Sequence, residues 1–239
     1  MIKKYVRPER VKDCLMLKYM IYDERRCNFD EVKSDIEKLY DYFQDDSHNT
    51  AAITLDLIIR NTFNPESKDE FIYDKIIVSV IVSRTEHDHY VTSRSIFSSR
   101  HHSSIIKIED HAMHSKLDFT CVFAHEIGHI IYRFRMDNTK YVNYPNFPTD
   151  KDLDNFKYDF EESCADAFAI AVLGSVNKFV VSNIALKNYV KKHHTKDCKR
   201  MIELTDSRNA KFKSFANLDE IKEEYYFTRK KRSHNIFLN

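Results

Sequence analysis

The stretch HEIGH, residues 125–129, combines residue types and a spacing that could do chemistry at a metal ion. Residues four apart lie on one face of a helix, so His125 and His129 can offer two imidazoles to the same ion. On such a helix Glu126 is rotated by about 100° from His125, and it can reach the open side of the ion without binding it. Two neutral bases beside an acid predict a bound zinc ion, Zn2+, whose water loses a proton to Glu126 and attacks a carbonyl carbon.

The surroundings of this pattern decide its meaning, because chance can supply a bare HExxH sequence. Residues 116–134, KLDFTCVFAHEIGHIIYRF, repeat apolar residues with helical period over a length that exceeds a normal strand. Two unsatisfied histidines buried on this helix would be costly, although two structural histidines are the alternative interpretation. Gly128 stands in mid-helix at a cost of about 1 kcal/mol relative to alanine. This glycine predicts the close approach of another helix or of a substrate backbone.

A catalytic zinc ion also needs a third protein ligand and one open position. A third histidine six residues after His129 would supply it in one known arrangement, but Arg135 occupies that position. The later segment EESCAD offers Glu161 and Glu162 on a second predicted helix. Glu162 lies four residues before Asp166, so these two carboxylates share a helix face. We predict Glu162 as the third ligand, Asp166 as the partner of the outer nitrogen of a ligand histidine, and Glu161 facing away from the ion.

The helices and strands that must position these side chains can be predicted from the spacing of apolar residues along the chain. Only two glycines and four prolines interrupt the chain, which favours long helices. Three helices are predicted in the first part of the chain, near 8–24, 29–44 and 50–62. Three strands follow, at 75–83, 90–97 and 104–110. The first two strands are predicted to form a hairpin, and the third is either an interior strand or one that accepts an extended peptide as an added strand.

The ligand-bearing helices are predicted at 116–134 and 159–174, with a loop between them, and the chain beyond residue 176 reads as helical and basic. Together these elements predict an α+β protein. Three regions of what is expected to be one structural unit can be separated: an N-terminal helical region at 1–70, a metallopeptidase core at 71–185, and a basic, mainly helical region at 186–239.

Composition narrows the class of protein. The chain of 239 residues is 42% hydrophobic and 31% charged with a net charge of +1, which predicts a folded protein and argues against nucleic-acid or membrane-surface binding by the whole chain. From residue 176 onward, 15 basic residues face 7 acidic ones, with RKKR at 229–232 as the densest run. Such runs are usually solvated, so a nucleic-acid partner remains a minor alternative.

Location is predicted from the same composition. No apolar run reaches the length of a membrane span and no signal peptide is recognisable, so a cytoplasmic protein is expected unless it leaves by a non-classical route. The five cysteines are odd in number and form no CxxC pair, which predicts reduced thiols.

Other residues give weaker signals. Several histidines suggest a second metal site, although solvated histidines are the ordinary case: His87, His89, His101, His102, His111 and His114. A group that stabilises the transition state is expected opposite the base, and the sequence leaves six candidates open: Tyr132, Tyr141, Tyr144, Tyr158, His193 and His194. Cys121, one turn before His125, is interpreted as a small buried thiol rather than as a metal ligand.

The two segments FTCVFAHEIGHII and EESCADAFA resemble the ImmA/IrrE family of metallopeptidases. The first helix of that family reads approximately FTxAHExGHxxxH and the second reads ExxANxFA. Matched position by position, His125 and His129 correspond to the two histidine ligands, Glu126 to the base and Glu162 to the third ligand. Asp166 stands where the family usually has asparagine.

The resemblance covers roughly residues 75–185. It implies a compact minigluzincin fold, in which a small, mainly antiparallel sheet packs on the HExxH helix beside a second ligand-bearing helix, and it implies protein or peptide substrates. The sequence departs from the family where IAVLGS follows the FA pair, and no helix-turn-helix module precedes the core. We therefore expect a zinc-dependent metallopeptidase. The alternative is a zinc-containing regulatory or binding module with little hydrolytic activity, which contacts a protein or nucleic acid through its basic C-terminal region.

Overall fold

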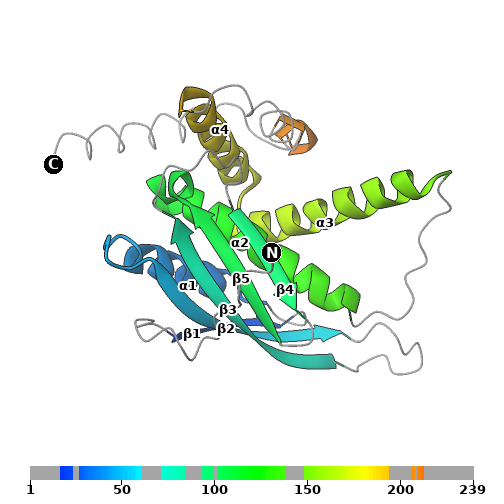
Figure 1. The fold of residues 1–239 in the computed structure, drawn as a ribbon, viewed down its shortest axis with the longest axis horizontal. Coiled ribbons are helices and arrows are strands. Elements are labelled where there is room, and N and C mark those ends of the chain that lie inside the picture. Colours follow the sequence, from blue (N-terminus) through cyan, green and yellow to red (C-terminus); the bar gives the residue numbers. More distant parts are fainter. Residues whose placement is uncertain are drawn as a thin grey trace, which may run out of the picture.

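A single sheet with helices packed on one of its faces forms the core of the fold (Figure 1). The computed structural model describes residues 17–23, 27–60, 71–83, 93–98, 102–137, 148–193, 206–207 and 209–212. The elements in chain order are β1 (Leu17–Asp23), α1 (Phe29–Tyr42), β2 (Thr50–Arg60), β3 (Phe71–Ser83), β4 (Ser93–Ser98), β5 (Ser103–Glu109), the 3₁₀ helix η3 (Asp110–His114), α2 (Lys116–Asp137), α3 (Asp150–Leu173) and α4 (Val176–His193). The α+β class predicted from the sequence is confirmed.

The sheet has five strands in the order β1-β2-β3-β5-β4, and it is mixed rather than mainly antiparallel. Strands β1 and β2 pair in parallel, as do β3 and β5, whereas β2–β3 and β4–β5 are antiparallel. The predicted hairpin between 75–83 and 90–97 is wrong, because β5 lies between those two strands. The reason is burial: β5 is mostly buried along its whole length, including its polar residues, which suits an interior strand, whereas the short β4, with four polar residues of six, suits an edge.

Strand β2 corrects the helix predicted at 50–62. Its buried side chains alternate along the strand with less buried ones: Ala51, Ile53, Leu55, Leu57 and Ile59 point into the core. This period of two is that of a strand with one buried face. The helix predicted near 8–24 is also wrong where it is described, because Leu17–Asp23 is the edge strand β1, and residues 8–16 lie outside the described residues.

Helix α1 confirms the prediction at 29–44. The Asn28 side chain caps it by accepting a hydrogen bond from the backbone amide of Glu31, at 3.3 Å. Val32, Ile36 and Leu39 are its buried face. These residues recur at helical spacing, so they form one stripe toward the sheet and α2.

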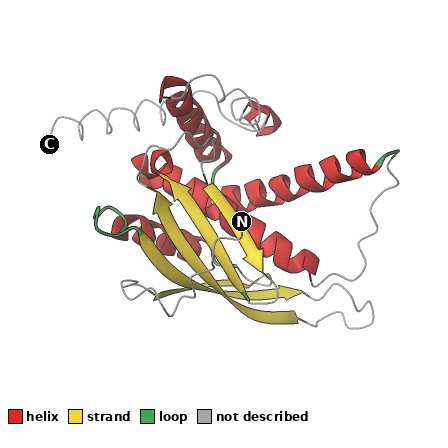
Figure 2. Ribbon diagram, in the orientation of Figure 1, coloured by secondary structure: helices red, strands yellow, loops and turns green. Residues whose placement is uncertain are grey.

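Helix α2 confirms the prediction at 116–134. Figure 2 shows it behind the sheet, on the same side as α1. Every residue from Asp118 to Ile131 is buried, because α2 lies between the sheet, α1 and α3. Aromatic rings hold it there: the Phe119 ring lies 5.5 Å from that of Phe123 and 5.6 Å from that of Tyr40 on α1.

Helix α3 is longer than the predicted 159–174. It begins at Asp150, where the hydroxyl of Thr149 accepts a hydrogen bond from the amide of Asp152 at 3.2 Å. Its first half is mostly polar and extends beyond the edge of the sheet (Figure 1), and its few apolar residues, Leu153, Phe156 and Phe160, recur at helical spacing that the prediction did not include. The helix ends at Gly174, whose φ of 66° is the left-handed conformation that glycine adopts without strain.

Helix α4 is joined to α2 by a buried hydrogen bond. The Ser182 hydroxyl donates to the Asp118 carboxylate at 3.0 Å, and both side chains are fully buried. This helix agrees with the helical pattern predicted after residue 176, while the RKKR run lies outside the described residues. Pairing of β2 with β3 also places strands from before residue 70 in the same sheet as the core, so the region at 1–70 is not purely helical.

No single helix among the described residues combines the length and apolarity that crossing a membrane requires. Helix α3 and residues Val176–Leu186 of α4 meet those criteria only as a pair bent by 113°.

Candidate metal centre

The site lies where α2 and α3 come into direct contact, and Gly128 permits that contact. A Cβ atom built on Gly128 would lie 2.7 Å from the Cα of Ala165 and 3.2 Å from the Cβ of Phe168. Real Cβ atoms do not approach backbone carbon that closely. Of the two explanations that the sequence left open for this glycine, the approach of another helix is therefore the one observed.

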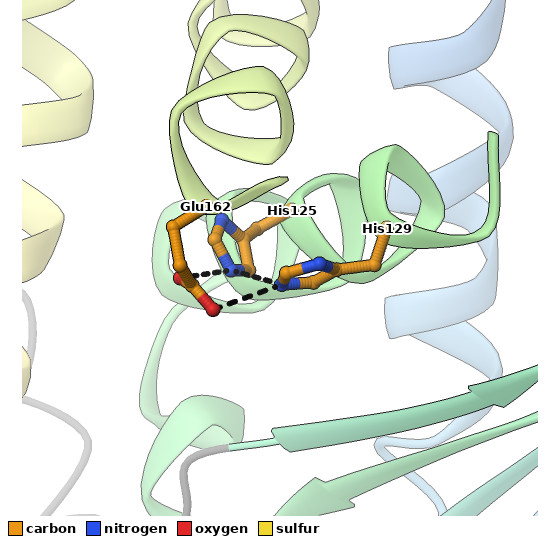
Figure 3. Close-up of side chains that lie close together, drawn as sticks. All are labelled: His125, His129 and Glu162. Carbon is orange, nitrogen blue, oxygen red and sulfur yellow. Dashed lines mark hydrogen bonds and ion pairs between the residues drawn. The ribbon is translucent and has the colours of Figure 1, made fainter. Parts of the chain in front are cut away.

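Three side chains from these helices converge at the crossing (Figure 3). The Nε2 atoms of His125 and His129 lie 3.0 Å apart. The carboxylate of Glu162 lies 3.4 Å from each of them, through Oε2 to His125 and through Oε1 to His129. One donor atom from each residue falls within 4.8 Å of the others, and this group could hold a metal ion.

Each histidine contacts a second carboxylate through its other nitrogen. Nδ1 of His125 lies 2.9 Å from Oδ1 of Asp166, which is the kind of contact expected for Asp166. Nδ1 of His129 lies 2.8 Å from Oε1 of Glu161. The expectation that Glu161 faces elsewhere is wrong, because α2 and α3 cross at an angle that brings both neighbouring glutamates onto the histidines.

These contacts determine which nitrogen of each ring carries the proton. An ionised carboxylate only accepts hydrogen bonds, so both Nδ1 atoms must donate. Both Nε2 atoms then present lone pairs to each other at 3.0 Å and to the carboxylate of Glu162. Three bases in this arrangement repel one another unless a cation or an additional proton lies between them. A set of two imidazoles and one carboxylate suits zinc and related divalent ions.

Burial and charge differ across the group. The His125 and His129 side chains are 11% and 7% exposed, whereas that of Glu162 is 20% exposed, so solvent reaches the group mainly from the Glu162 side. Burial raises the pKa of Glu161, but the hydrogen bond from His129 and the positive charge of Arg133 outweigh burial and bring the pKa below its usual value. Glu161 is therefore an ionised acceptor at neutral pH.

Glu126, the residue expected to act as a base, is buried on α2. It follows His125 directly in the chain, and 4% of the residue is exposed. A carboxylate inside the core needs a task or a partner to offset the loss of hydration.

The cysteines and the other histidines that the structure describes lie outside the candidate metal group. Cys121 is buried in the core cluster, and Cys27, Cys121 and Cys164 are present as thiols. Nδ1 of the exposed His102 contacts Oδ2 of Asp74 on β3 at 2.6 Å. Within the described residues, the group of His125, His129 and Glu162 is the one cluster that could hold a metal ion, so His102 and His114 form no second site there. The residues His87, His89 and His101 and the side chain of His111 lie outside the described part of the chain.

Two of the proposed transition-state groups can be placed. The ring of Tyr132 packs edge-on against that of Phe160 at 6.0 Å, and Tyr158 is half exposed one turn before Glu162. Tyr141, Tyr144 and His194, and the side chain of His193, lie outside the described residues.

Sequence reasoning missed one residue at this site. Arg133 donates from Nε to Oε1 of Glu161 at 2.7 Å. Its position four residues after His129 places both on one face of α2, and that spacing was the signal available in the sequence.

Comparisons of the chain with protein-family models, with curated proteins and with solved structures found no match. The resemblance to the ImmA/IrrE family therefore remains an expectation that rests on the two quoted segments.

Proposed function

We propose that this chain is a zinc-dependent metallopeptidase that hydrolyses peptide bonds of a protein substrate. One observation carries the proposal: two imidazoles and a carboxylate from α2 and α3 face one point, and carboxylates on both Nδ1 atoms leave both Nε2 atoms as electron-pair donors. This is the donor set of a zinc site with three protein ligands, which leaves a position open for chemistry.

The proposed chemistry divides between the ion and the chain. Zinc held by His125, His129 and Glu162 would supply a Lewis acid that polarises the scissile carbonyl and makes a water molecule more acidic. Glu126 accepts the proton of the attacking water and donates it to the leaving amine. The buried position of this carboxylate keeps bulk water from competing for that proton.

A buried structural site would make little use of Glu126, because closed zinc sites take four protein ligands and need no base. The more exposed Glu162 side gives substrate a route to the group. Strand β5 cannot accept an extended peptide as an added strand, because β3 and β4 occupy both its edges. In the described sheet, β1 and β4 each have one neighbour. Strand β4 is the edge strand that contacts α2, so its outer edge is where such a peptide would pair.

Metal analysis and a cleavage assay on the same preparations test the proposal. Wild type should contain about one zinc ion per chain, and His125→Ala should lose it. Glu126→Gln should keep the zinc and lose cleavage of unfolded casein or of cell-extract proteins, measured by mass spectrometry of newly formed N-termini. Asp154→Asn serves as control, because this side chain on α3 is 78% exposed and distant from the group along the helix.

The outcomes separate the proposal from its alternative. A wild type that binds no divalent metal refutes the metal site. A wild type that binds zinc, with cleavage unchanged in Glu126→Gln, refutes Glu126 as the base. Zinc binding without cleavage in any assay, together with salt-sensitive nucleic-acid binding that is abolished by neutralising residues 229–232, would establish the zinc-containing binding module instead.

A further inference from the structure

Glu161 contacts both His129 and Arg133 without belonging to the metal group itself. A single oxygen, Oε1, lies 2.8 Å from Nδ1 of His129 and 2.7 Å from Nε of Arg133. His129 and Arg133 are one helical turn apart on α2, while Glu161 comes from α3. One carboxylate oxygen thus receives two donors from successive turns of the ligand helix.

The contact to His129 controls which lone pair the ring offers. Because Oε1 accepts from Nδ1, the lone pair of His129 lies on Nε2 and points toward His125 and Glu162. A negative partner on Nδ1 also makes Nε2 a stronger electron-pair donor. Without that partner, the ring could rotate or place its proton on the nitrogen that faces the group.

The contact to Arg133 explains why Glu161 stays in this position. A glutamate on a helix surface ordinarily extends into water, and this side chain is still 21% exposed. The planar guanidinium fixes the carboxylate by a charge-assisted hydrogen bond, which is stronger than a neutral one. The Glu161 side chain is therefore held from two sides.

We propose that Glu161 and Arg133 form a positioning pair for His129, in which Glu161 orients the imidazole toward the metal and Arg133 holds Glu161 in place. This inference rests on the proposed metal site. It gives the two adjacent glutamates separate tasks, with Glu162 as ligand and Glu161 as the partner of a ligand. In this proposal both residues act through His129, and neither is a metal ligand or a base.

Metal affinity of the purified apo-protein is the direct test, measured by competition with a chromophoric chelator. Glu161→Ala should weaken zinc binding about 10–100-fold, the usual effect of removing such a partner. Glu161→Gln should recover part of that loss, because its amide oxygen still accepts from Nδ1 while its charge is gone. Asp154→Ala, on the exposed part of α3, should bind zinc like wild type.

Arg133→Met separates the two roles. It should weaken zinc binding by less than Glu161→Ala, and the double variant should bind no more weakly than Glu161→Ala alone, because Arg133 acts only through Glu161. If the losses of zinc affinity in the two single variants add fully in the double variant, Arg133 does not act through Glu161 and the proposal is refuted.

Two further measurements distinguish positioning from a merely structural link between α2 and α3. The visible spectrum of the cobalt-loaded protein should change in Glu161→Ala, because it reports ligand geometry, and the thermal midpoint of the apo-protein shows whether the variant still folds. A lowered midpoint with unchanged zinc affinity and cobalt spectrum would refute the inference and leave only a link between helices. A wild type that binds no metal would instead refute the proposed function.

Discussion

Replacement of Gly128 by alanine tests the packing that brings the two ligand helices together. The added Cβ would lie 2.7 Å from the Cα of Ala165 and 3.1 Å from its carbonyl oxygen. Carbon atoms in favourable contact are about 3.5–4.0 Å apart, so α3 must move away from α2 by about 1 Å. Both neighbours are backbone atoms, and a change of rotamer cannot relieve the contact.

The expected change in the free energy of unfolding combines two opposing contributions, helix propensity and overpacking. Alanine favours the helix by about 1 kcal/mol over glycine. Overpacking of a filled interior costs about 1–3 kcal/mol, so the folded state should lose up to about 2 kcal/mol in all. Metal binding should suffer more than stability. A displacement of about 1 Å moves Glu162 away from both histidines, whereas metal–ligand distances tolerate about 0.2 Å.

Two assays on Gly128→Ala check this reasoning: thermal unfolding of the apo-protein by circular dichroism, and zinc affinity by chelator competition. We expect a lower midpoint and an affinity reduced about tenfold or more, which corresponds to about 1.4 kcal/mol. Ala167→Gly is the control. It alters helix propensity by a similar amount at an exposed position of α3, and it should leave zinc affinity unchanged. A Gly128→Ala protein as stable as wild type with unaltered zinc affinity would refute the argument.

Three further predictions concern single contacts. Asp166→Ala should weaken zinc binding about 10–100-fold by freeing Nδ1 of His125, as chelator competition would show, and equal affinity would contradict this role. Burial, with a smaller effect of the Asp23 carboxylate, raises the pKa of Cys27 to about 11. The rate of its alkylation by iodoacetamide, followed by peptide-resolved mass spectrometry, should therefore be slow at pH 8 and increase up to about pH 11. A rate that reaches a plateau near pH 9 would contradict this prediction. Thr149→Ala should cost about 1 kcal/mol in urea unfolding through loss of the α3 cap, and an unchanged midpoint would argue against that cap.

The ligand helix could be predicted from the sequence because its signals agree. The apolar period, the length of the segment and the unusual glycine in α2 all point to a buried helix that contacts a close neighbour. Strand β2 was mistaken for a helix because adjacent apolar residues, Leu57, Ile58 and Ile59, satisfy either period over a short window. The alternation of Ile53, Leu55 and Leu57 with Thr54 and Asp56 is the period-two signal of a strand, and pairing with β3 confirms it.

The task of Glu161 could not be predicted for a geometric reason. Adjacent residues on a straight helix point about 100° apart, so one member of a glutamate pair is expected to face away from a site that the other faces. The crossing of two helices lets both glutamates reach different histidines on α2. The crossing angle depends on how the side chains of the two helices pack together, and the spacing of residues in the sequence does not predict that angle.

The candidate ligands come from two consecutive helices, and Glu162 follows His129 by 33 positions. An ion held by both helices would act as a reversible cross-link that closes this segment. Because the unfolded chain lacks the assembled group, the free energy of binding would add to folding, by about 2.7 kcal/mol when free metal is 100 times the dissociation constant. The melting temperature of the protein would then report the concentration of available metal, and chelation would loosen the α2–α3 contact.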